Sequence, residues 1–406
     1  MKLKNIVFAL LLLTTTSSCG FLFGSKQDDT IDDILQQGSI DPNLIPNKVG
    51  YVPILPIWKD FNAPVDVYVG YDEMVYICDQ NGVHILDQKG DEQRLINIQG
   101  ATDVVQDRRL FTYILGKITK SVNGQNYQLA AVFKVANASG AGTPIFVDTL
   151  IHPFNDASRN TTNFRNALDE QVAFTGIGTL HNNEIYLART GPTNQQSAVA
   201  RPDNTILFYD ENLANTGSAV SLNSSSSSLK SMLNISALTT FAAPPQSAFG
   251  INASPDFLML QTAPQAEYKV LWIKQTYSAD LGYDYTENAG LLNYDTSKTS
   301  GFLYQSFRFG QPADICVAPD ETGYIFVVDA QKDSLFQFTN KGFEGVNPPA
   351  NSGIKKQIIA SFGGRGAGVF QLNQPSGVAY FKRVVYIADK GNNRIIRYKL
   401  STDLEK

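Results

Sequence analysis

Short apolar runs with a shared beginning recur along the chain. Six times, a small or acidic residue directly precedes a β-branched aliphatic residue at the start of such a run. The six pairs are Asp66-Val67, Asp103-Val104, Gly176-Ile177, Gly250-Ile251, Asp314-Ile315 and Gly377-Val378. Most are followed by a second apolar run and then by turn residues, which is the pattern of short β-strands. Repetition of one strand unit along the chain predicts a fold built from structural repeats.

The two best-preserved units indicate how many strands one repeat contains. The fifth unit divides into four short strands, PADICVAP, GYIFVVD, SLFQFTN and KKQIIASFG, whereas the sixth contains only three. The segment VGYVPILPIW at 49–58 precedes the first unit and belongs to no other, so we expect it to supply the missing strand. The sequence therefore predicts an all-β, six-bladed β-propeller over 49–400, with the last blade closed by an N-terminal strand.

Composition supports strands and argues against one class of partner. The chain of 406 residues is 43% hydrophobic and 17% charged, and Phe (24) and Tyr (18) are far more frequent than Trp (2) or Met (4). Frequent Phe and Tyr favour strands. The formal net charge of −5 repels phosphate backbones, so we expect no nucleic-acid partner.

The N-terminus has the pattern of a targeting segment. Lys2 and Lys4 precede the apolar run IVFALLLL, and small residues then lead to Cys19. We expect 1–18 to be a signal peptide, because its apolar part is too short to span a bilayer. The ending TSSCG resembles a bacterial lipobox with Thr16 in the place of the usual Leu, which predicts lipidation of Cys19; plain secretion is the alternative.

The residues between Cys19 and the propeller are polar and acidic. Residues 19–48 are predicted to form a flexible tether between the lipid and the propeller, and 401–406 a short C-terminal tail. Within the tether, Thr30 lies in an Asp-Thr-Ile motif of the kind that Bacteroidota O-glycosylate. Thr30 is therefore a possible acceptor of a glycan.

The sixth unit resembles a known repeat. PSGVAYFKRVVYIADKGNNRIIRYKL at 375–400, preceded by ASFGGRGAGVFQLNQ, is similar to an NHL repeat, and 311–342 and 62–90 are looser copies. A lipid-anchored propeller of this composition resembles the six-bladed outer-membrane lipoproteins of Bacteroidota. This resemblance implies the propeller fold and a position at the outer membrane of the cell envelope, on either the periplasmic or the surface side. Such a resemblance transfers fold better than function.

Three aspartates share one register position in the repeat. Asp66, Asp103 and Asp314 are predicted to begin innermost strands, near one mouth of the central channel. One interpretation is an acidic ring that binds Ca²⁺, which prefers several carboxylate oxygens. The other is that each carboxylate accepts hydrogen bonds from backbone N–H groups at a tight turn, as Gly serves sterically in the other units.

Three further aspartates, Asp79, Asp329 and Asp389, end second strands. The NHL resemblance places such an Asp in the tight turn between the second and third strands. Asn392 and Asn393 are predicted to accept left-handed backbone angles there, and Arg394 is placed to pair with Asp389. We expect structural roles for these residues.

Enzyme signatures are weak. Propeller lactonases and lyases use convergent Glu, Asn, His and Asp side chains, whereas His84, His152 and His181 are predicted to point to different places. The glycine-rich segment at 363–368 lies in a connector with no helix after it to bind phosphate. Cys78 and Cys316 belong to units that are not neighbours, so we expect free buried thiols. The protein is therefore predicted to be non-catalytic and to need no cofactor.

Long loops in units two to four are candidates for binding, because loops on a rigid scaffold often carry function. They cover 117–127, 151–172, 189–204 and 236–246. These loops are predicted to bring six side chains together on one face, namely Tyr127, His152, Arg159, Arg165, Arg189 and Arg201. This mixture suits polar or anionic ligands and peptide surfaces; solvated loop decoration is the alternative.

The opposite face is predicted to carry a tyrosine-rich insertion at 275–300. It contains Tyr277, Tyr283, Tyr285 and Tyr294. Exposed Tyr clusters mark protein contacts or sugar-stacking platforms, whereas the alternative is that the rings fold over the sheet edge. We expect deletion of 276–299 to leave folding intact and to weaken partner binding.

The favoured function is that of a non-catalytic envelope lipoprotein whose propeller binds a protein partner at the outer membrane. The membrane itself would be contacted through the lipid anchor alone. Two alternatives stay open: a glycan-binding or small-ligand-binding propeller, and a Ca²⁺-dependent, lactonase-like enzyme.

Overall fold

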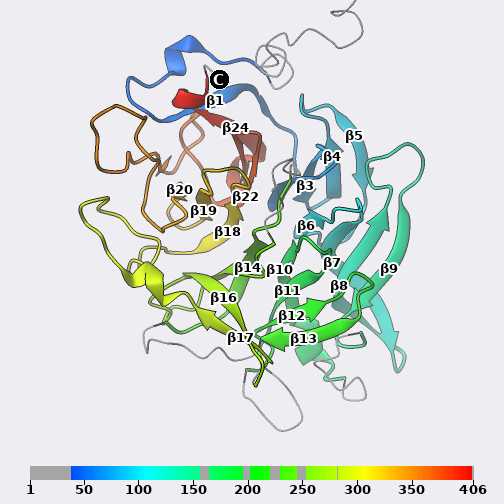
Figure 1. The fold of residues 1–406 in the computed structure, drawn as a ribbon. Helices are drawn as coiled ribbons and strands as arrows, with labels where there is room; N and C mark the ends of the chain where they lie inside the picture. Colours follow the sequence, from blue (N-terminus) through cyan, green and yellow to red (C-terminus); the bar gives the residue numbers. More distant parts are fainter. Residues whose placement is uncertain are drawn as a thin grey trace, which may run out of the picture.

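The computed structural model describes residues 38–155, 164–194, 202–219, 229–244, 253–280 and 282–404. These residues form six four-stranded antiparallel sheets around a central axis (Figure 1). The prediction of an all-β, six-bladed β-propeller is confirmed. Helical structure in the described ranges is limited to α4 (Ala167–Glu170) and short 3₁₀ turns. None of their helices is long and apolar enough to cross a membrane.

Each blade is a meander of consecutive strands. Blade 1 consists of β2 (Asp66–Val69), β3 (Val75–Asp79), β4 (Gly82–Leu86) and β5 (Glu92–Ile96); blade 2 of β6 (Asp103–Gln106), β7 (Thr112–Val122), β8 (Gln125–Ala136) and β9 (Ile145–Ile151); blade 3 of β10 (Ala173–Thr179), β11 (Ile185–Thr190), β12 (Thr205–Tyr209) and β13 (Asn215–Ala219). Blade 4 consists of β14 (Ile235–Thr240), β15 (Phe257–Gln261), β16 (Val270–Ser278) and β17 (Gly282–Glu287); blade 5 of β18 (Pro312–Val317), β19 (Ile325–Asp329), β20 (Ser334–Phe338) and β21 (Phe362–Gly363); blade 6 of β22 (Pro375–Phe381), β23 (Val384–Asp389), β24 (Arg394–Leu400) and β1 (Tyr51–Trp58). The first strand of each unit is the innermost, and neighbouring innermost strands contact one another around the ring.

The N-terminal strand closes the ring, as predicted. β1 pairs with β24 in antiparallel register, with Tyr51 opposite Leu400. The guanidinium of Arg397 in β24 lies 4.2 Å from the ring centroid of Trp58 and donates a hydrogen bond of 3.0 Å to the carbonyl of Pro56. Contacts with β1 thus stabilise the guanidinium of an arginine that is only 1% exposed.

The innermost strand of blade 4 differs from the prediction. Gly250-Ile251 was expected to begin it, and 236–246 was expected to be a loop. β14 instead occupies Ile235–Thr240, and Gly250 and Ile251 lie outside the described residues. Four innermost strands share a register shift near their start, and Ala237 takes the position that Gly176 has in blade 3. Polar residues in ISALTT obscured the apolar pattern of this strand.

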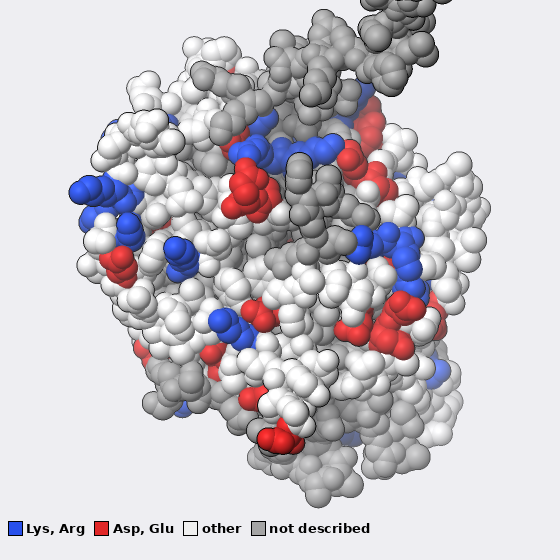
Figure 2. All heavy atoms as spheres, in the orientation of Figure 1, with Lys and Arg blue, Asp and Glu red and all other residues white. Residues whose placement is uncertain are grey.

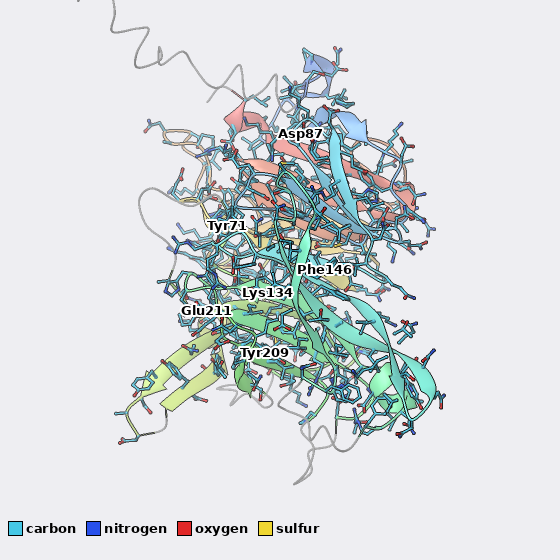
Figure 3. The ribbon with its side chains drawn as sticks, turned by 90° about the vertical axis from the view of Figure 1, so that its right-hand side faces the viewer. Tyr71, Asp87, Lys134, Phe146, Tyr209 and Glu211 are labelled. Atoms are coloured by element: carbon cyan, nitrogen blue, oxygen red, sulfur yellow. The ribbon has the colours of Figure 1, made fainter. Side chains whose placement is uncertain are left out.

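Loops alternate between the two faces because the strands of each blade are antiparallel. Connectors between blades and loops between second and third strands lie on one face, here called the connector face. Residues 117–127, expected to be a loop there, extend the β7–β8 hairpin instead, with a two-residue turn in which Asn123 and Gly124 have positive φ. The β16–β17 hairpin connects third and fourth strands and extends from the opposite face, so the two hairpins point to opposite sides in Figure 3.

The hydrophobic core lies between neighbouring blades. Tyr186 of blade 3 meets Phe257 of blade 4 with ring centroids 5.4 Å apart. Phe326 of blade 5 stacks on Tyr380 of blade 6 at 5.3 Å. On the face that Figure 2 shows, acidic and basic side chains are interspersed.

Candidate functional site

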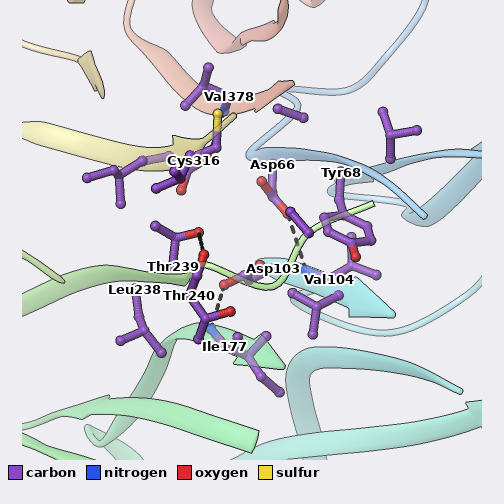
Figure 4. Close-up of a pocket in the computed structure, with 18 of the residues that line it drawn as sticks. Asp66, Tyr68, Asp103, Val104, Ile177, Leu238, Thr239, Thr240, Cys316 and Val378 are labelled. Atoms are coloured by element: carbon purple, nitrogen blue, oxygen red, sulfur yellow. Dashed lines mark hydrogen bonds between the residues drawn. The ribbon is translucent and has the colours of Figure 1, made fainter. Parts of the chain in front are cut away.

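The three register aspartates line the central channel and connect neighbouring blades (Figure 4). Each carboxylate accepts a hydrogen bond from a backbone N–H in the innermost strand of the next blade. The bonds are Val104 N–H to Asp66 (3.2 Å), Ile177 N–H to Asp103 (2.9 Å) and Val378 N–H to Asp314 (2.7 Å). The aspartates therefore bind backbone N–H groups, but those of the next blade rather than those of a local turn.

Glycine at the same position brings two blades into direct backbone contact. A Cβ atom on Gly176 would lie 2.5 Å from the nitrogen of Leu238, and one on Gly377 would lie 2.6 Å from the Cα of Asp66. These separations are too short for any side chain. The alternation of Asp and Gly in the sequence therefore reflects two ways of joining neighbouring blades: a bridging carboxylate or direct backbone packing.

Burial dominates the electrostatics of the channel. Desolvation, followed by repulsion from Asp314, raises the pKa of Asp103 to about 8, although the N–H of Ile177 favours its charged form. Desolvation also raises the pKa of Asp66 and of Asp314 well above the ordinary value, and neighbouring carboxylates add to both shifts. At neutral pH the channel therefore holds protonated carboxyl groups.

One geometric observation bears on the Ca²⁺ interpretation, which stays a prediction. Within the described ranges, no three His, Cys, Asp or Glu side chains lie close enough together to hold a metal ion.

The channel itself is narrow. Its cavity measures about 70 Å³ and is also lined by Ala242, Ala243 and Pro244 of the loop after β14, which crosses one end. Small-molecule sites usually measure roughly 300–1,000 Å³, so this cavity has room for a few waters and not for a substrate. Cys316 lines it, and both Cys316 and Cys78 are free thiols, as predicted.

Aspartates at the ends of second strands hold tight turns, as predicted. Asp389 accepts hydrogen bonds from Asn373 N–H (2.7 Å) and from the Nε of Arg394 (2.7 Å), and Asn393 has a left-handed backbone with φ of 53°. Asn392, the other predicted left-handed residue, does not have a positive φ. Asp79 and Asp329 likewise accept backbone N–H groups.

The histidines occupy separate places, as predicted. His84 lies between Asp79 (3.0 Å) and Glu92 (2.6 Å) in blade 1. His152 contacts Asp169 (3.3 Å) after blade 2, and His181 lies in a turn of blade 3. Because the three histidines lie in different parts of the fold and the two with ion-pair contacts meet different carboxylates, they do not form one site.

The proposed binding side chains of units two to four face inward. Tyr127 is 7% exposed, and His152 and Arg189 are fully buried. Arg165 forms ion pairs with Asp169 (2.6 Å) and Asp203 (3.2 Å).

Among the described side chains, Arg165 and His152 share Asp169, and Arg165 also pairs with Asp203. The expectation that these side chains are free for a partner is wrong for Tyr127, His152 and Arg189, which are buried. The two carboxylates hold the guanidinium of Arg165. Arg159 and Arg201 lie outside the described residues.

The tyrosine-rich insertion divides into exposed and structural residues. Tyr277 and Tyr283 are 69% and 67% exposed and face each other across the β16–β17 hairpin. Tyr285 stacks on Phe208 at 4.9 Å, and the hydroxyl of Tyr294 donates to the carbonyl of Tyr304. Tyr277 and Tyr283 are therefore exposed as the first alternative requires, whereas Tyr285 and Tyr294 pack against the protein as the second expects.

The expected dispensability of 276–299 is wrong. This segment includes β17, the outermost strand of blade 4, and the buried Leu291. Its deletion would expose the edge of β16. The lipidation residue Cys19 and the candidate glycan acceptor Thr30 lie outside the described residues.

Sequence reasoning missed a pocket of about 570 Å³ on the connector face of blades 4 to 6. Its lining comes from strand ends, turns and connectors far apart in the sequence, between Ser236 and Lys390. One signal was available: the glycine-rich segment at 363–368 contains Arg365, which lines this pocket.

No protein-family model and no curated protein matches the chain. Solved structures share its fold at low identity. An auxiliary nutrient binding protein from Bacteroides thetaiotaomicron is 11% identical, with a TM-score of 0.49 over 90% of this chain and 75% of that one. A protein of unknown function from the same organism is 13% identical, with a TM-score of 0.44 over 88% and 73%. A gluconolactonase from Xanthomonas campestris is 9% identical, with a TM-score of 0.45 over 90% and 94%.

These neighbours include both binding proteins and enzymes. At such identities the likeness concerns the fold alone. The six four-stranded sheets make the chain a six-bladed β-propeller, a scaffold that serves many unrelated functions.

Proposed function

We propose that this protein is a non-catalytic binding protein of the bacterial cell envelope that docks a protein partner through the tip of the β16–β17 hairpin. The observation that carries this proposal is the pair Tyr277 and Tyr283. Their rings lie 5.1 Å apart, and each is about two-thirds exposed. Tyrosine is enriched at the energetic centres of protein interfaces, because it buries a large ring and offers a hydroxyl.

The hairpin tip is held in place by its base. Tyr285 stacks on Phe208, and the hydroxyl of Tyr285 accepts a hydrogen bond from the side-chain amide of Gln275 (2.5 Å). Glu287 at the end of β17 is 3% exposed and accepts a hydrogen bond from Ser231 (2.6 Å). A preorganised hairpin loses less conformational entropy when it binds than a free loop does.

The envelope location rests on the N-terminal sequence. A signal peptide over 1–18 and a lipid on Cys19 would tether the propeller to a membrane, with the outer membrane as the proposed site. The described chain enters the propeller at β1, on the outer side of blade 6. The lipid anchor would therefore be connected to the propeller through blade 6, whereas the tyrosine hairpin belongs to blade 4.

Catalysis is the weaker alternative. A lactonase-like site would lie in the central channel, where the cavity is about 70 Å³ and the aspartates already bind backbone N–H groups. Binding of a small ligand has a specific observation in its favour, the pocket of about 570 Å³ on the connector face.

The test is co-purification from native membranes. The full-length protein with a C-terminal tag is extracted in mild detergent and compared with the double variant Tyr277→Ser/Tyr283→Ser. The matched control is Ile354→Ser, which removes an apolar side chain that is 52% exposed elsewhere. We expect a stoichiometric partner with the natural protein and the control, and its loss with the double variant at unchanged melting temperature. Retention of the partner by the double variant would refute docking at this hairpin.

A further inference from the structure

The pocket on the connector face is built from three blades. Blades 4, 5 and 6 contribute the starts of their innermost strands, and their second-to-third-strand turns and connectors complete the wall. The lining residues are Ser236, Thr262, Gln311, Pro312, Ala313, Ala330, Gln331, Asp333, Arg365, Gln374, Ser376 and Lys390. Its volume of about 570 Å³ falls in the range of small-molecule sites.

The lining carries polar groups that face the pocket without a partner in the protein. Within the described residues, the side chains of Arg365 and Lys390 form neither an ion pair nor a hydrogen bond, and the same holds for the amides of Gln311, Gln331 and Gln374. Arg365 lies exposed at the rim, and Lys390 is half-buried. With Asp333, the charged lining groups add up to one net positive charge in a protein of net charge −5.

The turn that presents Arg365 is held on both sides. The N–H of Gly364 donates to the carbonyl of Asp333 (2.7 Å), and the N–H of Gly366 donates to the carbonyl of Leu372 (3.0 Å). Arg394 donates to the carbonyl of Ala367 (2.7 Å), just beyond Arg365. The glycine-rich segment therefore fixes the backbone below Arg365, which lowers the entropic cost of using its guanidinium.

The chemistry of the lining selects among ligands. A guanidinium binds a carboxylate through two parallel hydrogen bonds, and amide side chains both donate to and accept from hydroxyl groups. The lining contains no aromatic ring, so it lacks the stacking surface that an aromatic ligand would use. One net positive charge favours a monoanion.

We propose that this pocket binds a small hydroxylated carboxylate, of which a hexuronic acid is the representative. Arg365 and Lys390 receive the carboxylate, and the glutamine amides and Asp333 receive the hydroxyl groups. The proposal is independent of docking at the tyrosine hairpin, which lies on the opposite face. Free uronic acid and the end of an acidic oligosaccharide share this chemistry.

Calorimetric titration of the detergent-solubilised full-length protein tests the proposal. The probes are galacturonic acid, its linear trimer, galactose and inorganic phosphate. Galactose keeps all the hydroxyl groups of galacturonic acid and has a CH₂OH group in place of the carboxylate, whereas phosphate has negative charge without the hydroxyl arrangement. Arg365→Gln and Lys390→Gln remove the two cations, and Lys355→Gln is the control, because Lys355 is an exposed lysine outside the lining.

We expect saturable binding of galacturonic acid, at least a ten-fold weaker affinity in each pocket variant, and no change with Lys355→Gln. Trimer binding ten-fold tighter than the monomer identifies an oligosaccharide as the source, and equal binding identifies the free acid. Equal affinity for galactose overturns the role of the carboxylate, and equal affinity for phosphate overturns the role of the hydroxyl groups. Absence of binding by both acids overturns the proposal as a whole, and this comparison does not depend on the variants.

Discussion

The carboxylate of Asp103 in blade 2 accepts a hydrogen bond of 2.9 Å from the backbone N–H of Ile177 in blade 3. Equivalent bonds from Asp66 and Asp314 join two other pairs of blades. The ring is therefore joined at its narrowest radius by carboxyl groups whose pKa is raised by burial, that of Asp103 to about 8. The side chains that join neighbouring blades are therefore the same ones whose pKa is raised by burial.

Stability should consequently depend on pH through Asp103. In the unfolded chain this carboxyl ionises near its ordinary pKa of about 4, whereas burial raises the folded pKa to about 8. Between these values the folded state binds more protons, so the free energy of unfolding falls as pH rises from about 4 to about 8. Asp103→Asn keeps an oxygen for Ile177 but does not ionise, so we expect a flatter profile and at least about 1 kcal/mol of relative gain at pH 8 compared with pH 5.

Urea unfolding at pH 5, 6, 7 and 8 measures this difference. Asp148→Asn is the control, because Asp148 is exposed on β9. Parallel profiles for the natural protein and Asp103→Asn would show that the channel carboxyl does not titrate in this range.

Direct contact between blades 6 and 1 predicts a steric effect at Gly377. A methyl group there would lie 2.6 Å from the Cα of Asp66 and 2.8 Å from the nitrogen of Val67. We expect Gly377→Ala to cost about 1–3 kcal/mol of unfolding free energy, because neither backbone can move without opening the ring. Gly217→Ala is the matched control, since its nearest neighbour would be Phe208 at an ordinary 3.5 Å. Equal denaturation midpoints for the two variants would refute close packing at Gly377.

Ring closure by β1 predicts a strong effect at Ile54. This side chain is 3% exposed and packs in one cluster with Trp58, Tyr386 and Ile395. Ile54→Ala would leave a cavity in this buried cluster, so we expect a loss of about 2–5 kcal/mol of unfolding free energy. Limited proteolysis should then cleave first near β1. Asn126→Ala, at an exposed position of β8, is expected to have little effect; similar resistance of both variants would mean that β1 is not needed for closure.

The tyrosine hairpin can be shortened without loss of the blade. Replacing 277–283 by Asn-Gly connects Thr276 to Asp284, which already face each other across the hairpin. We expect the free energy of unfolding to change by less than about 0.5 kcal/mol, because Tyr285 keeps its contact with Phe208. Deletion of 276–299 should instead unfold blade 4. Thermal unfolding followed by circular dichroism distinguishes them, and equal stability of the two deletions would contradict a structural role for β17.

The fold could be predicted because it depends on patterns among residues that are close in the sequence. Strand-length apolar runs, the shared Asp or Gly position and the surplus strand at 49–58 each depend on adjacent residues. The Asp389–Arg394 pair was predictable for the same reason, since both residues border one turn. The innermost strand of blade 4 was not predicted correctly, because Ser236 and Thr239 interrupt the apolar pattern of β14.

The sites depend on contacts between residues distant in sequence, which no local pattern of residues predicts. From the sequence alone, Arg165 is a candidate for ligand binding. In the folded protein its guanidinium pairs with Asp169 and Asp203. Arg365 and Lys390 line one pocket only because blades 5 and 6 are neighbours. Lipidation of Cys19 and the NHL resemblance stay predictions.

The position of β1 beside β24 also sets the order of assembly. Synthesis proceeds from the N-terminus, so β1 emerges before any blade, yet its hydrogen-bonding partner is the last described strand. Until β24 has been synthesised, the apolar strand β1 has no partner for its backbone hydrogen bonds. An unpaired apolar strand of this kind is prone to aggregate and is a typical target of chaperones. A chain interrupted before residue 394 therefore leaves both β1 and β23 with open edges, and completion of the ring coincides with completion of blade 6.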